Sequence, residues 1–120
     1  PDYKKGLIEY ANFLIKVKKF DKSLELIENI QEDENLKFQY YLAKGKANMG
    51  MEQYEDAIED LLEGNKIYNS DTRLLNSLGF CYYKTGEKDE ALNVLKASLR
   101  LNPGQEGIKR LIDEIEKGRD

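Results

Sequence analysis

The sequence contains no histidine and only one cysteine, Cys81, among its 120 residues. Without histidine, neither a Cys–His catalytic pair nor a His-based metal site can form. A single cysteine excludes an internal disulfide and is compatible with a reducing compartment such as the cytoplasm. Cys81 lies within the apolar stretch GFCYYK, which favours a small packed side chain over a nucleophile. We therefore expect a protein without enzymatic activity, metal or cofactor.

Long apolar runs, a basic charge balance and glycine-rich phosphate loops are also missing. A membrane span needs about 18–20 predominantly apolar residues, and no run approaches that length. The formal net charge is −4, whereas nucleic-acid binding needs a basic surface. The first ten residues, PDYKKGLIEY, have no apolar signal-peptide core. These absences argue against membrane insertion, nucleic-acid binding and phosphate chemistry.

Helix breakers are scarce and charged residues are abundant. Pro1 and Pro103 are the only prolines, so about a hundred residues between them are free of helix breakers. Charged residues make up 35% of the chain, against roughly 25% in soluble domains, and the mean hydropathy is −0.72. The chain is about one domain long. This composition favours an elongated helical body with much surface per residue.

Small and apolar residues recur every 34 positions along the chain. Six columns align at this offset without a gap: Leu7, Tyr41 and Leu75; Ala11, Gly45 and Gly79; Ser23, Ala57 and Ala91; Leu24, Ile58 and Leu92; Ile27, Leu61 and Leu95; Ile30, Gly64 and Ser98. An internal period of this length indicates a stack of repeated helical units.

Each unit is expected to fold as two helices, most clearly in the third unit. A first buried face there consists of Leu74, Leu75, Leu78 and Tyr82, and a second consists of Ala91, Leu92, Leu95, Ser98 and Leu99. Gly86 suits the left-handed residue that ends the first helix. Gly79 and Ala91 are expected where the two helices cross, because bulkier side chains there would force the backbones apart.

The third unit resembles a tetratricopeptide repeat (TPR). It contains Leu75-x2-Leu78-Gly79-x2-Tyr82, then Ala91-x3-Leu95, then Pro103. The second unit has Lys44 and Asn48 where that pattern has Leu and Tyr, and the first unit is the most degenerate. The resemblance implies an all-α, right-handed superhelix of three repeats at about 4–37, 38–71 and 72–105, in a single domain over residues 1–120.

One further helix is expected after the three units, at about residues 105–118. Its apolar stripe is Ile108, Leu111, Ile112 and Ile115, and the other positions are mostly charged. A helix with a polar back is what a solenoid needs to shield its last repeat. The same segment is also compatible with the first helix of a fourth repeat.

The resemblance implies that the first helix of each unit lines a concave groove that binds a partner protein or peptide. The candidate ligand-binding residues are Asn12, Gln39, Leu42, Lys46, Arg73, Asn76, Phe80, Tyr83 and Lys84. Cationic side chains outnumber anionic ones among the groove positions, whereas the second helix of unit two holds Glu55, Asp56, Glu59, Asp60 and Glu63, interpreted as a solvated face. A basic groove on an acidic body favours an acidic partner segment.

TPR proteins that bind chaperone tails use a carboxylate clamp of two Lys, two Asn and one Arg. Its positions correspond here to Ile8, Asn12, Ala43, Arg73 and Ser77. Only Asn12 matches in kind, and Arg73 is a like-charged replacement. We therefore expect the clamp to be absent.

Two other roles fit the sequence. One is self-assembly through an end or the convex face, in which the stripe around Ile108 and Ile115 would be a contact surface. The other is a regulatory domain of a longer protein, with which the missing initiator methionine is compatible. In solution we expect a monomer or a weak homo-oligomer.

Overall fold

The computed structural model describes residues 3–118 of the chain and contains seven α-helices in that range. They are α1 (Tyr3–Lys16), α2 (Phe20–Ile27), α3 (Lys37–Gly50), α4 (Tyr54–Ile67), α5 (Thr72–Lys84), α6 (Lys88–Leu101) and α7 (Glu106–Lys117). Two short 3₁₀ segments, Glu28–Ile30 and Glu34–Leu36, join α2 to α3. Residues 1, 2, 119 and 120 of the predicted domain lie outside the described part.

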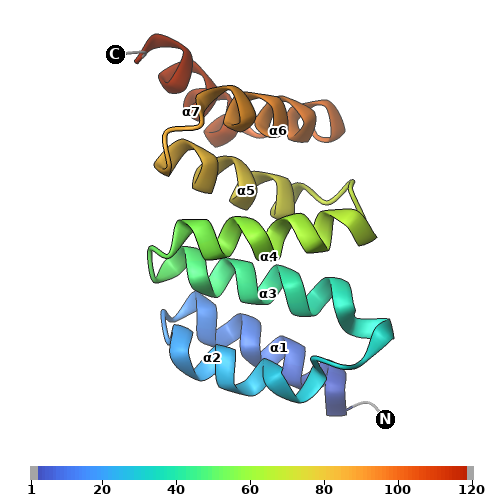
Figure 1. Cartoon of the computed structure of the whole chain (residues 1–120). Helices are drawn as coiled ribbons and strands as arrows, with labels where there is room; N and C mark the ends of the chain where they lie inside the picture. The colour runs from blue at the N-terminus through green and yellow to red at the C-terminus, as the bar shows by residue number, and fades with distance from the viewer. Residues whose placement is uncertain (1–2, 119–120) are drawn as a thin grey trace.

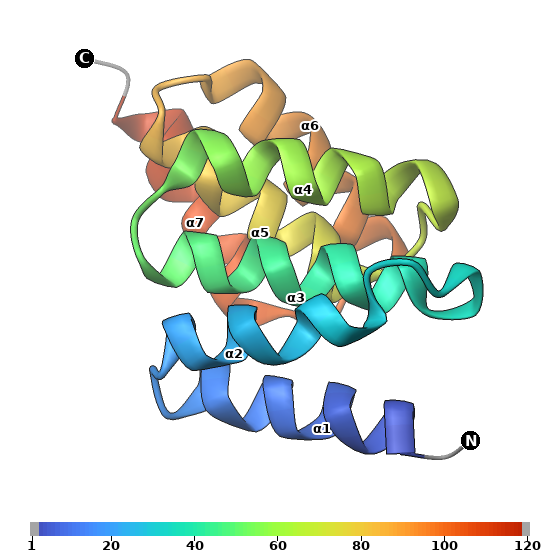
Figure 2. The same cartoon turned by 60° about the horizontal axis from the view of Figure 1, so that its bottom comes forward.

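The helices form antiparallel pairs that stack along one axis, from α1 and α2 at one end to α7 at the other (Figures 1 and 2). The stack measures 47 × 26 × 22 Å, so it is elongated, as the charge-rich composition predicts. The prediction of an all-α, right-handed superhelix is confirmed. No helix within residues 3–118 combines the length and the apolar character that a membrane crossing requires.

Glycine allows the two helices of a pair to approach closely in units two and three. A Cβ added at Gly45 would lie 2.6 Å from the side chain of Leu61, and one added at Gly79 would lie 2.5 Å from that of Leu95. Both partners are completely buried. The repeat therefore needs a small residue here, because the leucine of the facing helix occupies the space that a larger side chain would take.

The turn inside each unit requires one residue in the left-handed conformation. Lys18, Glu52 and Gly86 occupy this place with φ of 66°, 63° and 85°, and they are spaced by the same 34 residues. The prediction for Gly86 is confirmed. Lys18 and Glu52 adopt a conformation that disfavours side chains with a Cβ.

Three clusters of buried side chains follow one another along the stack. The first joins Ala11, Ile27 and Ile30 to Tyr40 and Ala43; the second joins Leu42, Ala57 and Leu61 to Leu74, Leu78 and Cys81; the third joins Ala91 and Leu95 to Ile112 and Ile115. Each cluster spans two successive units or the last unit and α7. Burial raises the pKa of the Cys81 thiol to about 12, which fits a packed side chain rather than a nucleophile.

The apolar stripe of α7 packs against α6. Ile112 and Ile115 are buried, and Ile108 and Leu111 are partly buried in the same cluster. Lys96 pairs with Glu116 at 2.9 Å, and Lys88 Nζ donates to the carbonyl of Gly118. The suggestion that this stripe offers a free contact surface is therefore wrong, because α6 already covers it.

Unit two contains a buried polar network where the repeat pattern has Leu and Tyr. Asn48 Nδ2 donates to Asp60 Oδ2 at 2.8 Å, and Lys44 Nζ lies 3.7 Å from Asp60 Oδ1. Burial raises the pKa of Asp60 above its ordinary value, although the hydrogen bond from Asn48 and the charge of Lys44 oppose that effect. The interpretation of Asp60 as part of a solvated face is therefore wrong.

Candidate functional site

The candidate residues lie on α1, α3 and α5, the first helices of the three units. The structure leaves Asn12, Gln39, Arg73 and Lys84 exposed, and it partly buries Lys46, Asn76, Phe80 and Tyr83. Leu42 is only 6% exposed and belongs to the second core cluster. Its assignment to the groove surface is therefore wrong, because its side chain packs in the core with residues of α4 and α5.

Arg73 is paired with a carboxylate on its own helix terminus. Its Nη2 donates to Asp71 Oδ2 at 2.6 Å, and its Nε donates to Asp71 Oδ1 at 3.1 Å. Asp71 also accepts the backbone N–H groups of Arg73 and Leu74 and so caps α5. The Arg73 guanidinium holds the pKa of Asp71 below its ordinary value, against the opposing effect of burial.

Asp71 is a functional candidate that the groove positions did not include. An Asp directly before a helix is a recognisable capping signal. The sequence could therefore have predicted that Asp71 caps the N-terminus of α5. Its pairing with Arg73 reduces the excess of positive charge expected from the cationic residues alone.

Lys46 lies between the two outer units and is half-buried. Its pKa is below the ordinary lysine value, first because of burial and second because of the positive charge of Arg73; Asp71 acts in the opposite direction. Within residues 3–118, no carboxylate lies within ion-pair distance of Lys46. Lys46 is therefore a partly desolvated cation that has no salt bridge to the described residues.

Asn76 connects α5 to the start of α7. Its Nδ2 donates to Gln105 Oε1 at 2.8 Å, and Gln105 Nε2 in turn donates to Ser98 Oγ at 3.0 Å and to the Ser98 carbonyl. The Oδ1 atom of Asn76 is buried and accepts no hydrogen bond from residues 3–118. Gln105 was not among the predicted site residues, and no sequence signal pointed to its contact with Asn76.

The aromatic candidates are fixed by neighbours. Phe80 makes an edge-to-face contact with Tyr54 at a centroid distance of 6.1 Å, and Lys84 Nζ lies 5.6 Å from the centroid of the Phe80 ring. Tyr83 packs against the third core cluster. These contacts hold the rings in place while leaving each partly exposed.

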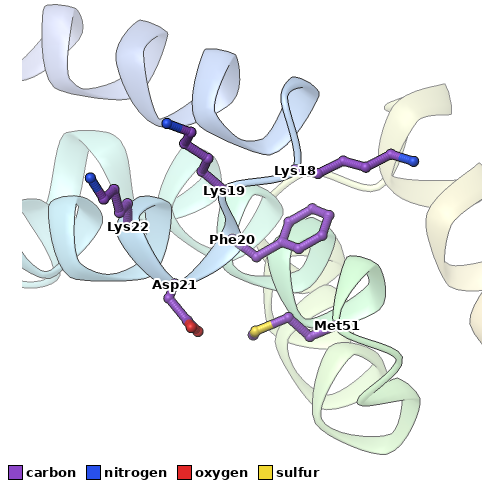
Figure 3. Close-up of a pocket in the computed structure, with 6 residues that line it drawn as sticks. All are labelled: Lys18, Lys19, Phe20, Asp21, Lys22 and Met51. Carbon is purple, nitrogen blue, oxygen red and sulfur yellow. The ribbon is translucent and has the colours of Figure 1, made fainter.

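A hollow of about 400 Å³ lies outside the predicted groove, at the turns of units one and two. Figure 3 shows Phe20 and Met51 close together, with Lys18, Lys19 and Lys22 extending away from them. The Phe20 ring lies against Gly50, where an added Cβ would clash with it. Sequence reasoning missed this hollow, although three lysines around one phenylalanine were visible in KKFDK.

Two models of the tetratricopeptide repeat match adjoining parts of the sequence, residues 38–71 and 72–105. Together these matches span more than half of the chain. The chain belongs to the tetratricopeptide repeat family. Its first unit, with α2 shortened to Phe20–Ile27, lies outside the two matches.

Two curated proteins share parts of this TPR sequence. Anaphase-promoting complex subunit 3 of Dictyostelium discoideum is 40% identical over 65 residues, which cover 53% of this chain and 7% of that protein. Heat shock protein STI1 of Saccharomyces cerevisiae is 26% identical over 110 residues, which cover 91% of this chain and 19% of that protein. The chain thus spans less than a fifth of the length of either relative.

Solved structures of other TPR domains have the same fold. The first TPR domain of human RPAP3 superimposes with a TM-score of 0.88 at 16% identity, covering 98% of this chain and 92% of that one. The first TPR of Spaghetti (RPAP3), bound to the HSP90 peptide SRMEEVD, gives a TM-score of 0.87 at 16% identity, covering 95% and 90%.

The five clamp positions offer few polar groups to a ligand in this TPR domain. Ala43 and Ser77 are buried, and Ile8 packs against the first core cluster. Asn12 and Arg73 are exposed, but Arg73 is already paired with Asp71. Arg73 is therefore the one cation among the clamp positions, and the other cation close to it is Lys46, which lies outside the clamp.

Proposed function

We propose that the chain is a protein-interaction module that binds a segment of a partner protein along the surface of α1, α3 and α5, without catalysing a reaction. Membership of the TPR family supports a binding role. The likeness to a domain solved with a bound HSP90 peptide supports a peptide or protein segment as the ligand. The proposal depends on this analogy for the class of ligand and on the groove residues for its chemistry.

The observation that carries the proposal is the half-buried Lys46 beside Arg73. Removing a cation from water costs free energy unless an anion pairs with it. Because Lys46 has no salt bridge within the described residues, a carboxylate of a ligand would compensate its charge. We therefore propose an acidic partner segment, with its carboxylate close to Lys46 and Arg73.

The remaining candidates would contribute contact area and hydrogen bonds. Phe80 and Tyr83 are partly exposed aromatic side chains that their neighbours already hold in place, so little side-chain entropy would be lost on binding. The amides of Asn12 and Gln39 are exposed and can pair with the backbone of an extended segment. Lys84 adds positive charge beside Phe80.

The proposal is tested by selecting binders from a random peptide library on the immobilised protein and measuring the enriched peptides by fluorescence anisotropy. We expect acidic residues to be enriched, and we expect Lys46→Glu to weaken binding at least tenfold. Lys66→Glu makes the same charge change on α4, where Lys66 is exposed and pairs with Glu63, and should bind like the wild type.

Binding should also weaken as pH rises into the alkaline range. The acidic ligand needs Lys46 protonated, and the pKa of Lys46 lies below the ordinary lysine value of 10.5. The loss of affinity should therefore begin at a lower pH than an ordinary lysine would give. Peptides that show no acidic preference, or that bind Lys46→Glu as tightly as the wild type, would refute the proposal.

A further inference from the structure

Helix α1 and Val17, the residue directly after it, expose a row of large apolar side chains. Tyr3, Tyr10, Phe13 and Val17 are 62%, 53%, 55% and 43% exposed. Their spacing places them on one face of the helix, together with Gly6. The rings of Tyr10 and Phe13 stack at a centroid distance of 6.4 Å. We call these five residues the α1 row.

Most of the equivalent positions of the next two units are buried, and Lys44 is the exception because it is partly exposed. A shift of 34 residues takes Gly6, Tyr10 and Phe13 to Tyr40, Lys44 and Ala47 in α3, and to Leu74, Leu78 and Cys81 in α5. Leu74, Leu78 and Cys81 pack against Ala57 and Leu61 of the preceding unit, and Tyr40 packs against Ile27 and Ile30 in the same way. The α1 row is therefore the same type of face, left uncovered.

Large and small side chains occupy opposite positions in the α1 row and in the equivalent faces of α3 and α5. Where α3 and α5 have the large Tyr40 and Leu74, α1 has Gly6. Where they have the small, completely buried Ala47 and Cys81, α1 has Phe13. A preceding helix that packs as α2 packs on α3 would therefore clash with Phe13 and leave a gap at Gly6. The α1 row does not fit one more repeat of the kind found inside this chain.

We propose that the α1 row binds a second copy of this chain, as an antiparallel pair of α1 helices related by a two-fold axis. An axis midway between Tyr10 and Phe13 places Tyr10 of one copy on Phe13 of the other. The same axis places Val17 opposite Gly6, where an added Cβ would meet nothing within 4 Å. The protruding side chains of one copy thus meet the open position of the other.

The charges beside the α1 row are self-complementary in this arrangement. Glu9 and Lys16 are exposed along one edge. Lys22 and Glu25 lie along the other edge, where they line a hollow of about 370 Å³ with Tyr10. An antiparallel two-fold brings each edge against itself in the reverse direction. Glu9 then approaches Lys16 of the second copy, and Lys22 approaches Glu25.

The opposite end of the stack favours a closed pair over a filament. Helix α7 exposes mainly charged side chains, and none of the large exposed apolar residues in the described part of the chain belongs to it. Contact between α1 of one copy and α7 of the next would therefore leave the α1 row against a polar surface. A two-fold pair uses the apolar face completely and stops at two copies.

The dimer is tested by light scattering on a size-exclusion column, from low micromolar to near-millimolar protein. We expect the mass of the wild type to rise from 13.9 kDa toward twice that value. Phe13→Glu should remain monomeric at every concentration, since it buries two carboxylates at the contact. Leu101→Glu, the same type of change at an exposed residue of α6, should dimerise like the wild type. Circular dichroism checks that both variants fold.

The register is tested by disulfide trapping between two variants that each gain one cysteine, Gly6→Cys and Val17→Cys. Their mixture should form the mixed disulfide in preference to either symmetric one, and the native Cys81 is completely buried and does not compete. A wild type that stays monomeric throughout, or a dimer that persists in Phe13→Glu, would overturn the proposal. Symmetric disulfides in excess of the mixed one would overturn the register.

Discussion

At the scale of single residues, the turn inside each unit shows how one backbone conformation acts on three different side chains. Lys18, Glu52 and Gly86 all have positive φ. A residue with a Cβ pays roughly 1–2 kcal/mol for this conformation, whereas glycine does not. Glycine loses about 0.5–1 kcal/mol more conformational entropy on folding, which offsets part of that advantage. The repeat thus tolerates lysine and glutamate at some cost in stability.

We predict that Gly86→Ala lowers the free energy of unfolding by about 1 kcal/mol, because alanine is strained at positive φ. Gly6→Ala is the matched control. Gly6 lies inside α1, and an added Cβ there meets nothing, so alanine should raise stability by about 0.5–1 kcal/mol. Urea denaturation at low protein concentration measures both. If both substitutions raise the free energy of unfolding, or both lower it, the positive φ of Gly86 does not determine the sign of the change.

The residue scale also shows where reasoning from the sequence stops. Arg73 was assigned to the groove surface and is exposed, but its pairing with Asp71 depends on how the helix cap orients one carboxylate. Leu42 was assigned to the surface by its position in the unit, yet the packing of α5 buries it. The position of a residue within a repeat predicts only approximately which face of the helix it lies on. It does not determine what the neighbouring unit covers.

At the scale of helices, the pair α3 and α4 is held together partly by polar groups. Asp60 is buried between them and accepts a hydrogen bond from Asn48. Its raised pKa means that the folded state holds the proton more tightly than the unfolded state does. The contribution of Asp60 to stability is therefore largest at low pH, and it declines as pH rises from its ordinary value of 3.8 through the raised folded value.

We predict that Asp60→Asn removes this decline. The amide oxygen of the new side chain can still accept from Asn48, so the variant should become more stable relative to the wild type as pH rises from acidic to neutral. Urea denaturation across that range measures the difference, with Asp89→Asn in the first turn of α6 as control, because Asp89 is exposed. A wild-type advantage that grows with pH would show that the Lys44 ion pair outweighs the cost of burial.

The helices themselves were predictable because each one repeats the same constraints. The period of 34 residues places a small residue opposite a leucine in units two and three. In the structure, Leu61 and Leu95 occupy the space that a side chain at Gly45 or Gly79 would need. The Asn48–Asp60 network was not predictable from that pattern. Lys44 and Asn48 depart from the repeat signature, and only the facing helix shows that they converge on a carboxylate.

At the scale of the whole molecule, the stack offers two different surfaces. The proposed binding surface on α1, α3 and α5 has polar, cationic and aromatic side chains, whereas the α1 row is apolar and lies at one end. Lys46 and Arg73 belong to α3 and α5, whereas Phe13 belongs to the end face on α1. A substitution on one of these surfaces therefore leaves the other surface unchanged, so the two can be tested separately. The groove is the surface on which the proposed function depends.

The most direct test of that function compares Asp71→Asn with Arg73→Gln, using one acidic peptide selected by the wild type. Asparagine still caps α5 but no longer neutralises Arg73, so Asp71→Asn should tighten binding, whereas Arg73→Gln should weaken it. We expect a change of about two- to fivefold in Kd each way, as for a partly exposed charge pair of roughly 0.5–1 kcal/mol. Shifts in the same direction, or no change in either variant, would contradict an acidic ligand at Lys46 and Arg73.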